Sequence, residues 1–186
     1  MHGRSGDENM MYALDIQTVS DKMIACKEIR PMLIACPRMD DSLGLNAYES
    51  YFFDEVVPLV ERLYHTGTRH IGGFSAGGYN ALRYALLHPE LFACVGGHMP
   101  SIDDRMEDEG KFYQGCARLS PILENKYARV QNHLNKGHHD MMYIKANLEY
   151  YLKFYSQRCR QAMNAVLYIH GQGGSAAESK HYRATQ

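Results

Sequence analysis

Ser75 is the residue of this chain whose surroundings most clearly favour covalent chemistry. It stands in Gly-Phe-Ser-Ala-Gly, residues 73–77, which satisfies the pattern G-x-S-x-G. An apolar run precedes it and a helical pattern follows it, which is the context that places a nucleophile on a sharp strand-to-helix turn. A serine held there attacks an ester carbonyl once a neighbouring base removes its proton. The alternative is a glycine-rich turn that serves only close packing of a helix on a sheet.

The helix expected after Ser75 offers a way to stabilise negative charge. Its first N–H groups have no partner within the helix, and its positive end faces the serine. These groups suit an oxyanion that develops during attack on a carbonyl carbon. The backbone N–H of Ala76 is therefore the natural first oxyanion donor.

The elements around the serine alternate in type along the chain. Short apolar runs and longer amphipathic runs follow one another, which is typical of β–α–β units around a parallel sheet. The predicted strands are residues 29–37, 69–75, 91–99 and 128–135, and residues 164–174 read as a strand that runs into a glycine-rich loop. The predicted helices are residues 47–65, 76–88, 111–125 and 140–155. Pro58 predicts a kink in the first of these helices, and Pro121 predicts a break in the third.

Residues 71–92 resemble the nucleophile segment of the putative-esterase group of α/β-hydrolases, which includes esterase D, feruloyl esterases and acetyl xylan esterases. Residues 2–12 resemble its oxyanion loop, residues 51–64 its preceding helix, and residues 137–155 its catalytic-histidine segment and last helix. The resemblance covers residues 2–156 and keeps the order of the family's motifs. It implies a reduced α/β-hydrolase fold, with a mostly parallel sheet flanked by helices, and an activity that needs no cofactor.

The resemblance also implies roles for individual residues. Ser75 would be the nucleophile, His139 the base that removes its proton, and Asp108 the acid that orients the imidazole. The Arg4 N–H, in the glycine loop near the start, would be the second oxyanion donor beside Ala76. His138 is the alternative base, and Asp103 and Asp104 are the alternative acids.

Two parts of the family pattern have no counterpart at their usual positions. The strand-and-helix unit between the segments like residues 96–101 and 108–113 is missing, and so is the central strand that precedes the oxyanion loop. The C-terminal run Ala165 to Ile169 is the candidate to replace a central strand, beside the nucleophile strand of this molecule or of a neighbouring one. The loop His170 to Gly174 would then approach Ser75. The chain accordingly divides into a hydrolase core, residues 1–156, and a C-terminal strand and glycine-rich loop, residues 157–186, either packed into the sheet or disordered.

These residues predict a serine carboxylesterase that hydrolyses small acyl or hydroxycinnamoyl esters, including carbohydrate esters, through an acyl-enzyme. One alternative is a catalytically inactive hydrolase-like remnant or scaffold, which the missing acid strand favours. Another is an acyltransferase on the same fold, in which an alcohol replaces water as the acceptor.

Composition and charge exclude other classes of function. The formal net charge of −1 gives no reason to expect a nucleic-acid partner or a membrane surface. No signal-peptide pattern is present at Met1, so a cytoplasmic location is the default. The five cysteines are dispersed, which predicts reduced thiols and no metal site. A sheet with a free edge can pair across a two-fold axis, so a homodimer is a further expectation.

Overall fold

The computed structural model of the protein describes residues 1–39, 44–45, 47–65, 67–102, 109–126, 129–157 and 164–171. Four strands form one parallel sheet in the order β1-β2-β4-β3. The strands are β1 (His70–Phe74), β2 (Cys94–His98), β3 (Arg129–Lys136) and β4 (Asn164–Gly171). The helices are α1 (Met10–Ala13), α2 (Ile16–Ala25), α3 (Ala47–Tyr51), the π-helix η1 (Phe52–Val56), α4 (Val57–Tyr64), α5 (Ala76–Leu87), α6 (Glu109–Lys126) and α7 (Met141–Ser156).

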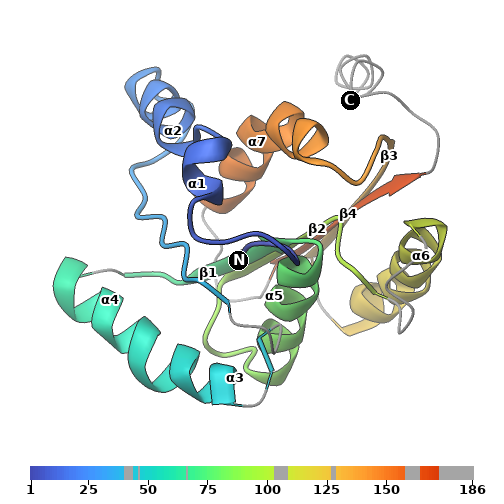
Figure 1. Ribbon diagram of the computed structural model, residues 1–186, viewed down its shortest axis with the longest axis horizontal. Helices are drawn as coiled ribbons and strands as arrows, with labels where there is room; N and C mark the ends of the chain where they lie inside the picture. Colours follow the sequence, from blue (N-terminus) through green and yellow to red (C-terminus); the bar gives the residue numbers. More distant parts are fainter. Residues whose placement is uncertain are drawn as a thin grey trace.

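Helices cover both faces of the sheet, as Figure 1 shows. The helices α1, α2 and α7 lie on one face, and α5, α6 and the run α3–η1–α4 lie on the other. Each face has its own buried apolar cluster, one around Phe74 and Tyr151 and one around Ile71 and Tyr84. The predicted α/β architecture, with a parallel sheet between helices, is confirmed.

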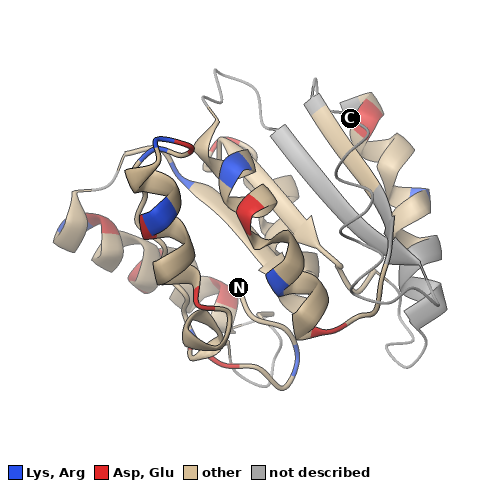
Figure 2. Ribbon diagram, turned by 90° about the horizontal axis from the view of Figure 1, so that it is seen from above, with Lys and Arg blue, Asp and Glu red and all other residues tan. Residues whose placement is uncertain are grey.

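Charged side chains are absent from the two strands beside the serine turn. Figure 2 shows acidic and basic residues interspersed along the helices, whereas β1 and β2 carry neither. Helices cover both faces of a parallel sheet, which favours apolar and small residues in strands such as these two. The edge strand β3 differs, because it begins with Arg129 and ends with Lys136. No helix within the described ranges combines the length and the apolarity that crossing a bilayer requires.

Residues 30–39 run extended but belong to no strand, so the strand predicted at residues 29–37 is wrong. Ile29 is buried in the cluster beneath α7, and the Arg30 N–H donates to the Ser156 hydroxyl at 2.7 Å. Beyond Arg30, the backbone of residues 31–38 makes no hydrogen bond with any described residue. An apolar run predicts a buried strand, but residues 31–38 are exposed or half-buried, and a strand also needs a neighbour with which to pair.

The C-terminal strand lies inside the sheet, but not beside the nucleophile strand. Residues of β4 pair with β2 on one side, for example Ala165 with Val95, and with β3 on the other. The prediction that Ala165 to Ile169 pairs with the nucleophile strand of the same molecule is therefore wrong. The reason is the slot that α6 leaves open: it connects β2 to β3 without placing them side by side, and β4 fills the position between them. In the family pattern, the missing strand-and-helix unit lies between the segments like residues 96–101 and 108–113. The position of β4 in the sheet therefore matches that of the missing strand.

The two prolines act differently from one another. Pro58 stands in the first turn of α4, directly after the π-helix η1, so the expected irregularity falls just before it. The first turn of a helix tolerates proline because its N–H groups lack intrahelical partners there. Pro121 lies inside α6, which continues through it, so the predicted break is wrong. Burial of Cys116 and Leu123 on either side of Pro121 holds the helix together despite the lost hydrogen bond.

The cysteines are not all reduced. Cys94 is disulfide-bonded, whereas Cys26, Cys36 and Cys116 are free thiols. The prediction of reduced thiols is therefore wrong for Cys94.

Candidate active site

Ser75 lies on the turn between β1 and α5 in a backbone conformation that side chains rarely adopt. Its φ is 54° and its ψ is −119°, and it is a non-glycine residue with positive φ. Such a conformation persists only where the surroundings hold it. Here the Ser75 N–H donates to the His98 carbonyl at 3.0 Å, and the Ser75 carbonyl accepts from the Tyr79 N–H at 3.0 Å. The turn thus projects a half-buried hydroxyl at the carboxyl edge of the sheet.

The two glycines of the pattern allow three backbone segments to meet at this turn. A Cβ at Gly77 would lie 2.3 Å from the His2 carbonyl oxygen and 2.4 Å from that of Met1. A Cβ at Gly73 would lie 2.4 Å from the backbone of Gly77. Real Cβ atoms do not come this close to backbone, so a side chain at either position would separate β1, α5 and the start of the chain. The prediction of a tight strand-to-helix turn is confirmed.

The segment from Met1 to Gly6 forms a loop against the serine. A Cβ at Gly3 would lie 3.2 Å from the Ser75 Cβ and 3.8 Å from its hydroxyl oxygen. His2 is buried and fixes the loop: its Nε2 accepts from the Met39 N–H at 2.8 Å. The proton of the neutral ring therefore lies on Nδ1, which donates to the Gly3 carbonyl at 2.9 Å. The sequence placed this loop near the serine, and the structure has it there.

Two backbone N–H groups near Ser75 are available to a ligand. Within the described ranges, no group accepts a hydrogen bond from the N–H of Ala76 or from that of Arg4. Ala76 is the first residue of α5, so its N–H points out of the helix end. Arg4 follows Gly3 on the loop that contacts Ser75. That these two groups donate to an oxyanion stays a prediction.

Ser101 is part of this site and was not foreseen from the sequence. Its hydroxyl lies 2.9 Å from the Ser75 hydroxyl, and its N–H donates to the Ser75 carbonyl at 3.1 Å. The Ser101 side chain is buried, with 6% of its surface exposed. The sequence could have indicated Ser101, because residues that follow adjacent parallel strands share the carboxyl edge of the sheet. Ser101 comes shortly after β2, the neighbour of β1.

His139 lies on the turn between β3 and α7. It is half-buried, and burial lowers the pKa of its imidazole, whereas the Asp140 carboxylate beside it acts in the opposite direction. Asp140 caps α7 by accepting from the Tyr143 N–H at 2.8 Å. The neighbouring His138 is exposed. The structure therefore gives His139 the more enclosed position of the two.

The sheet order fixes how His139 stands relative to Ser75. Both residues follow the carboxyl ends of parallel strands, so both lie at the same edge of the sheet. Three strand spacings separate β1 from β3, which is roughly 14 Å. The contact made by the Ser75 hydroxyl within the described ranges is with Ser101. The candidate acids Asp108, Asp103 and Asp104 lie outside the described residues.

His98 supports the turn through its backbone and the core through its ring. The ring is buried, stacks on Tyr151 with centroids 3.9 Å apart, and its Nε2 lies 2.9 Å from the Tyr155 hydroxyl. Burial lowers the pKa of His98 to about 3, so the ring is neutral at ordinary pH. His133 contacts the Tyr150 hydroxyl through Nε2 at 2.9 Å. Both histidines serve packing within the fold.

The chain is similar to several solved esterase structures. One is a ferulic acid esterase, with 18% identity over 98% of this chain and 80% of that chain, at a TM-score of 0.56. Another is the fluorophosphonate-binding serine hydrolase F of Staphylococcus aureus, with 17% identity over 98% and 78% of the two chains and a TM-score of 0.53. A third is the feruloyl esterase module from Clostridium thermocellum, with 16% identity over 98% and 72% and a TM-score of 0.52. At these identities the likeness shows a shared fold.

The family comparison covers the part of the chain that carries the elbow. No curated protein matches the chain. The model of the family described as "Putative esterase" matches residues 40–142, which is more than half of the chain and includes Ser75, Ser101 and His139. The chain therefore belongs to the putative esterase family, on an α/β-hydrolase fold.

Proposed function

We propose that this protein is a serine carboxylesterase whose nucleophile is Ser75. The observation that carries the proposal is the strained turn at Ser75, with φ 54° and ψ −119°, between β1 and the N-terminus of α5. A strain of this kind costs on the order of 1–3 kcal/mol and clusters at functional sites. A turn that served only close packing would place a glycine there, because glycine adopts positive φ at no steric cost.

The remaining roles are those that the resemblance to the family implies. His139 removes the proton as the Ser75 oxygen attacks the carbonyl carbon, and returns it to the leaving alcohol. Asp108 orients His139 and stabilises the imidazolium. The N–H groups of Ala76 and Arg4 donate to the oxyanion of the tetrahedral intermediate. Water, activated by His139, then attacks the acyl-enzyme and releases the acid and free Ser75.

The substrate class proposed is small acyl esters and hydroxycinnamoyl esters, including those of carbohydrates. The likeness to a ferulic acid esterase and to a feruloyl esterase module supports this choice. Membership of the putative esterase family supports ester hydrolysis in general.

The experiment compares the purified protein with Ser75→Ala on p-nitrophenyl acetate and methyl ferulate. We expect Ser75→Ala to lower kcat by about 10³-fold or more, as for the loss of a catalytic serine. A fluorophosphonate probe should label the parent at Ser75 and leave the variant unlabelled. Circular dichroism of both proteins controls for folding.

Other outcomes assign other functions. Equal rates and no labelling in both folded proteins would identify an inactive scaffold and overturn the proposal. Addition of an alcohol separates hydrolysis from acyl transfer, because a transferase forms the new ester at the expense of the free acid.

A further inference from the structure

The loop that contacts the candidate nucleophile carries a cation at its tip. The Gly6 N–H donates to the Gly3 carbonyl at 3.1 Å, so residues 3–6 form a tight turn with Arg4 and Ser5 at its two central positions. Ser5 has a φ of 62°, the left-handed conformation that the third residue of a type II turn adopts. Both central residues are exposed, so the turn presents the Arg4 side chain to solvent.

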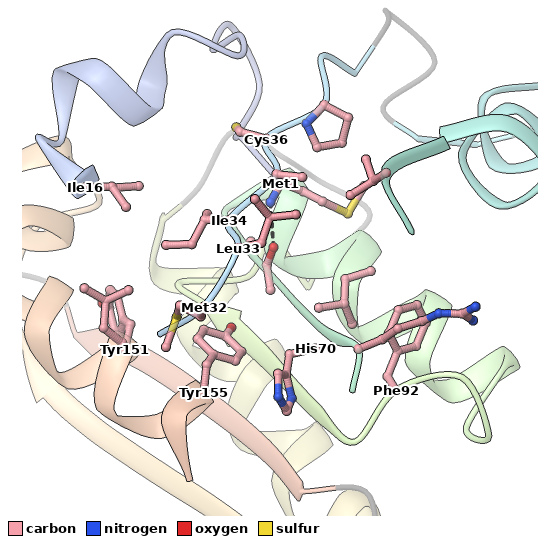
Figure 3. A pocket seen from close by; sticks show the side chains of 18 of the residues that line it. Met1, Ile16, Met32, Leu33, Ile34, Cys36, His70, Phe92, Tyr151 and Tyr155 are labelled. Atoms are coloured by element: carbon pink, nitrogen blue, oxygen red, sulfur yellow. Dashed lines mark hydrogen bonds between the residues drawn. The ribbon is translucent and has the colours of Figure 1, made fainter. Parts of the chain in front are cut away.

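Hydrogen bonds fix the backbone that leads into this turn. The Met1 nitrogen donates to the Gly72 carbonyl at 2.6 Å (Figure 3), and the Met1 carbonyl accepts from the Phe74 N–H at 3.1 Å. The ring of the buried His2 bonds to backbone groups through both of its nitrogens. The turn is therefore held in one position along β1.

Arg4 stands within reach of a substrate held by Ser75. A Cβ at Gly3 would lie 3.8 Å from the Ser75 hydroxyl oxygen. Consecutive Cα atoms are about 3.8 Å apart, so the Arg4 Cα lies within roughly 9 Å of that oxygen. An arginine side chain is long and ends in a planar head with N–H donors in a fixed fork. Its guanidinium can therefore meet a group of the substrate that lies a few bonds from the ester carbonyl.

No acidic group within the described ranges neutralises this cation. The Arg4 guanidinium forms no ion pair or hydrogen bond there, although Asp7 and Glu8 follow on the same loop. The Asp7 carboxylate instead accepts from the Asn9 N–H at 2.9 Å. Three other arginines bind an oxygen atom of the protein, namely Arg30, Arg69 and Arg83. The donors of Arg4 are thus available to a ligand.

We propose that Arg4 selects esters that carry a free carboxylate, through a bidentate salt bridge between its guanidinium and that carboxylate. The inference rests on the proposed esterase function and adds the residue that recognises the substrate. The fork of N–H donors matches the two carboxylate oxygens, which gives geometric selectivity as well as attraction. The positive end of α5, which begins at Ala76, favours the same charge. The Arg4 backbone N–H keeps its separate role towards the oxyanion.

Two matched pairs of esters test the proposal and show which part of the substrate carries the carboxylate. The first pair, 4-acetoxybenzoate and its methyl ester, differs by a carboxylate in the alcohol part. The second pair, monophenyl adipate and phenyl methyl adipate, differs by a carboxylate in the acid part. The quantity compared is the ratio of kcat/KM for the anionic ester to kcat/KM for the neutral ester of the same pair.

Arg4→Gln removes the charge and should lower this ratio at least fivefold for one of the pairs. Any effect of the substitution on the oxyanion loop is common to both esters of a pair and cancels in the ratio. Arg4→Lys keeps the charge but loses the fork, so it should retain part of the selectivity. Sodium chloride should lower the ratio of the parent, because salt screens an exposed charge pair.

The matched control is Arg62→Gln. Arg62 is an exposed arginine in the last turn of α4, outside the loop, so its replacement should leave the ratio of both pairs as in the parent. An equal fall of the ratio in Arg62→Gln and Arg4→Gln would mean that the net charge of the protein, and not Arg4, attracts the anionic ester.

Binding to the Ser75→Ala protein gives a readout that needs no hydrolysis. One of the two anionic esters should bind this protein at least fivefold more tightly than it binds the Ser75→Ala, Arg4→Gln double variant, as measured by calorimetry. The neutral ester of that pair should bind both proteins equally.

The outcomes separate this inference from the esterase activity. Hydrolysis of the neutral esters with a ratio that Arg4→Gln leaves unchanged in both pairs would overturn the inference and leave the esterase standing. If the parent hydrolyses no ester, the proposed function fails, and the binding comparison then decides whether Arg4 holds a carboxylate. Equal binding of both anionic esters with and without Arg4 would overturn the inference in that case too.

Discussion

The hydroxyl oxygens of Ser75 and Ser101 lie 2.9 Å apart, at the carboxyl ends of two adjacent parallel strands. The Ser101 N–H also holds the Ser75 carbonyl at 3.1 Å. A serine hydroxyl can accept one hydrogen bond while it donates another. Ser101 can therefore fix the Ser75 hydroxyl while leaving its proton for a base, which makes Ser101 a positioning residue.

Replacement of Ser101 by alanine should lower kcat/KM by about three- to tenfold, because a hydrogen bond contributes about 0.5–1.5 kcal/mol. Ser101→Thr keeps the hydroxyl and should restore most of the rate, with the same pH profile. Steady-state kinetics on p-nitrophenyl acetate measures both. A faster Ser101→Ala enzyme would mean instead that Ser101 competes with the base for Ser75.

Gly77→Ala should destabilise the protein, although alanine is the better helix former by about 1 kcal/mol. Its Cβ would stand 2.3 Å from the His2 carbonyl oxygen, and the resulting overpacking should cost about 1–3 kcal/mol or more. The matched control is Gly67→Ala, where the added Cβ meets nothing within 4 Å. Urea unfolding followed by circular dichroism compares the two. Equal stabilities of both variants would show that the chain start does not pack against α5.

The acid limb of the pH–rate profile should report His139. Burial lowers its pKa below 6.5, and the base must be unprotonated, so activity should persist below pH 6.5 and fall as pH drops through the lowered value. Asp140 favours the charged ring, so Asp140→Asn should move this limb to still lower pH while asparagine keeps the helix cap. A pH–rate profile that does not respond to Asp140→Asn, or activity that survives His139→Gln, would favour His138 as the base.

The acid of the proposed triad can be mapped by three matched substitutions. Asp108→Asn should lower kcat by about 10³- to 10⁴-fold, because the imidazole loses the group that fixes its tautomer. Asp103→Asn and Asp104→Asn should leave kcat within a few-fold of the parent. If Asp108→Asn stays active while one of the two controls loses most of its kcat, the aspartate replaced in that control is the acid of the triad.

Stability should fall in acid because His98 is buried as a neutral ring. Its pKa is lowered from 6.5 to about 3, so between these values the unfolded chain binds a proton there and the folded protein does not. The free energy of unfolding therefore decreases as pH falls from 6.5 towards 3. Urea unfolding at pH 7.5 and pH 5 should show a smaller decrease in the free energy of unfolding for His98→Gln than for the parent. The control variant His138→Gln changes an exposed histidine, so its decrease should equal that of the parent. An identical decrease in all three proteins would contradict this account.

The local features of this protein could be predicted from its amino-acid sequence. The pattern Gly-Phe-Ser-Ala-Gly, an apolar run before it and helical spacing after it, led to the turn at Ser75 because a sharp turn and its flanks are encoded within some twenty contiguous residues. The alternation of short apolar and longer amphipathic runs similarly predicted the parallel sheet, since periodicity reflects which faces are buried.

The pairing of the segments, in contrast, became clear from the three-dimensional fold. Residues 29–37 read as a strand but lack a neighbour, and Ala165 to Ile169 pairs with β2 and β3 instead of β1. Ser101 meets Ser75 for the same reason, across a contact of 26 positions in sequence. Backbone hydrogen bonds between strands are nearly the same for every sequence, so an apolar run does not specify the strand with which it pairs. The partner is set by the crossovers and by the slots that they leave open.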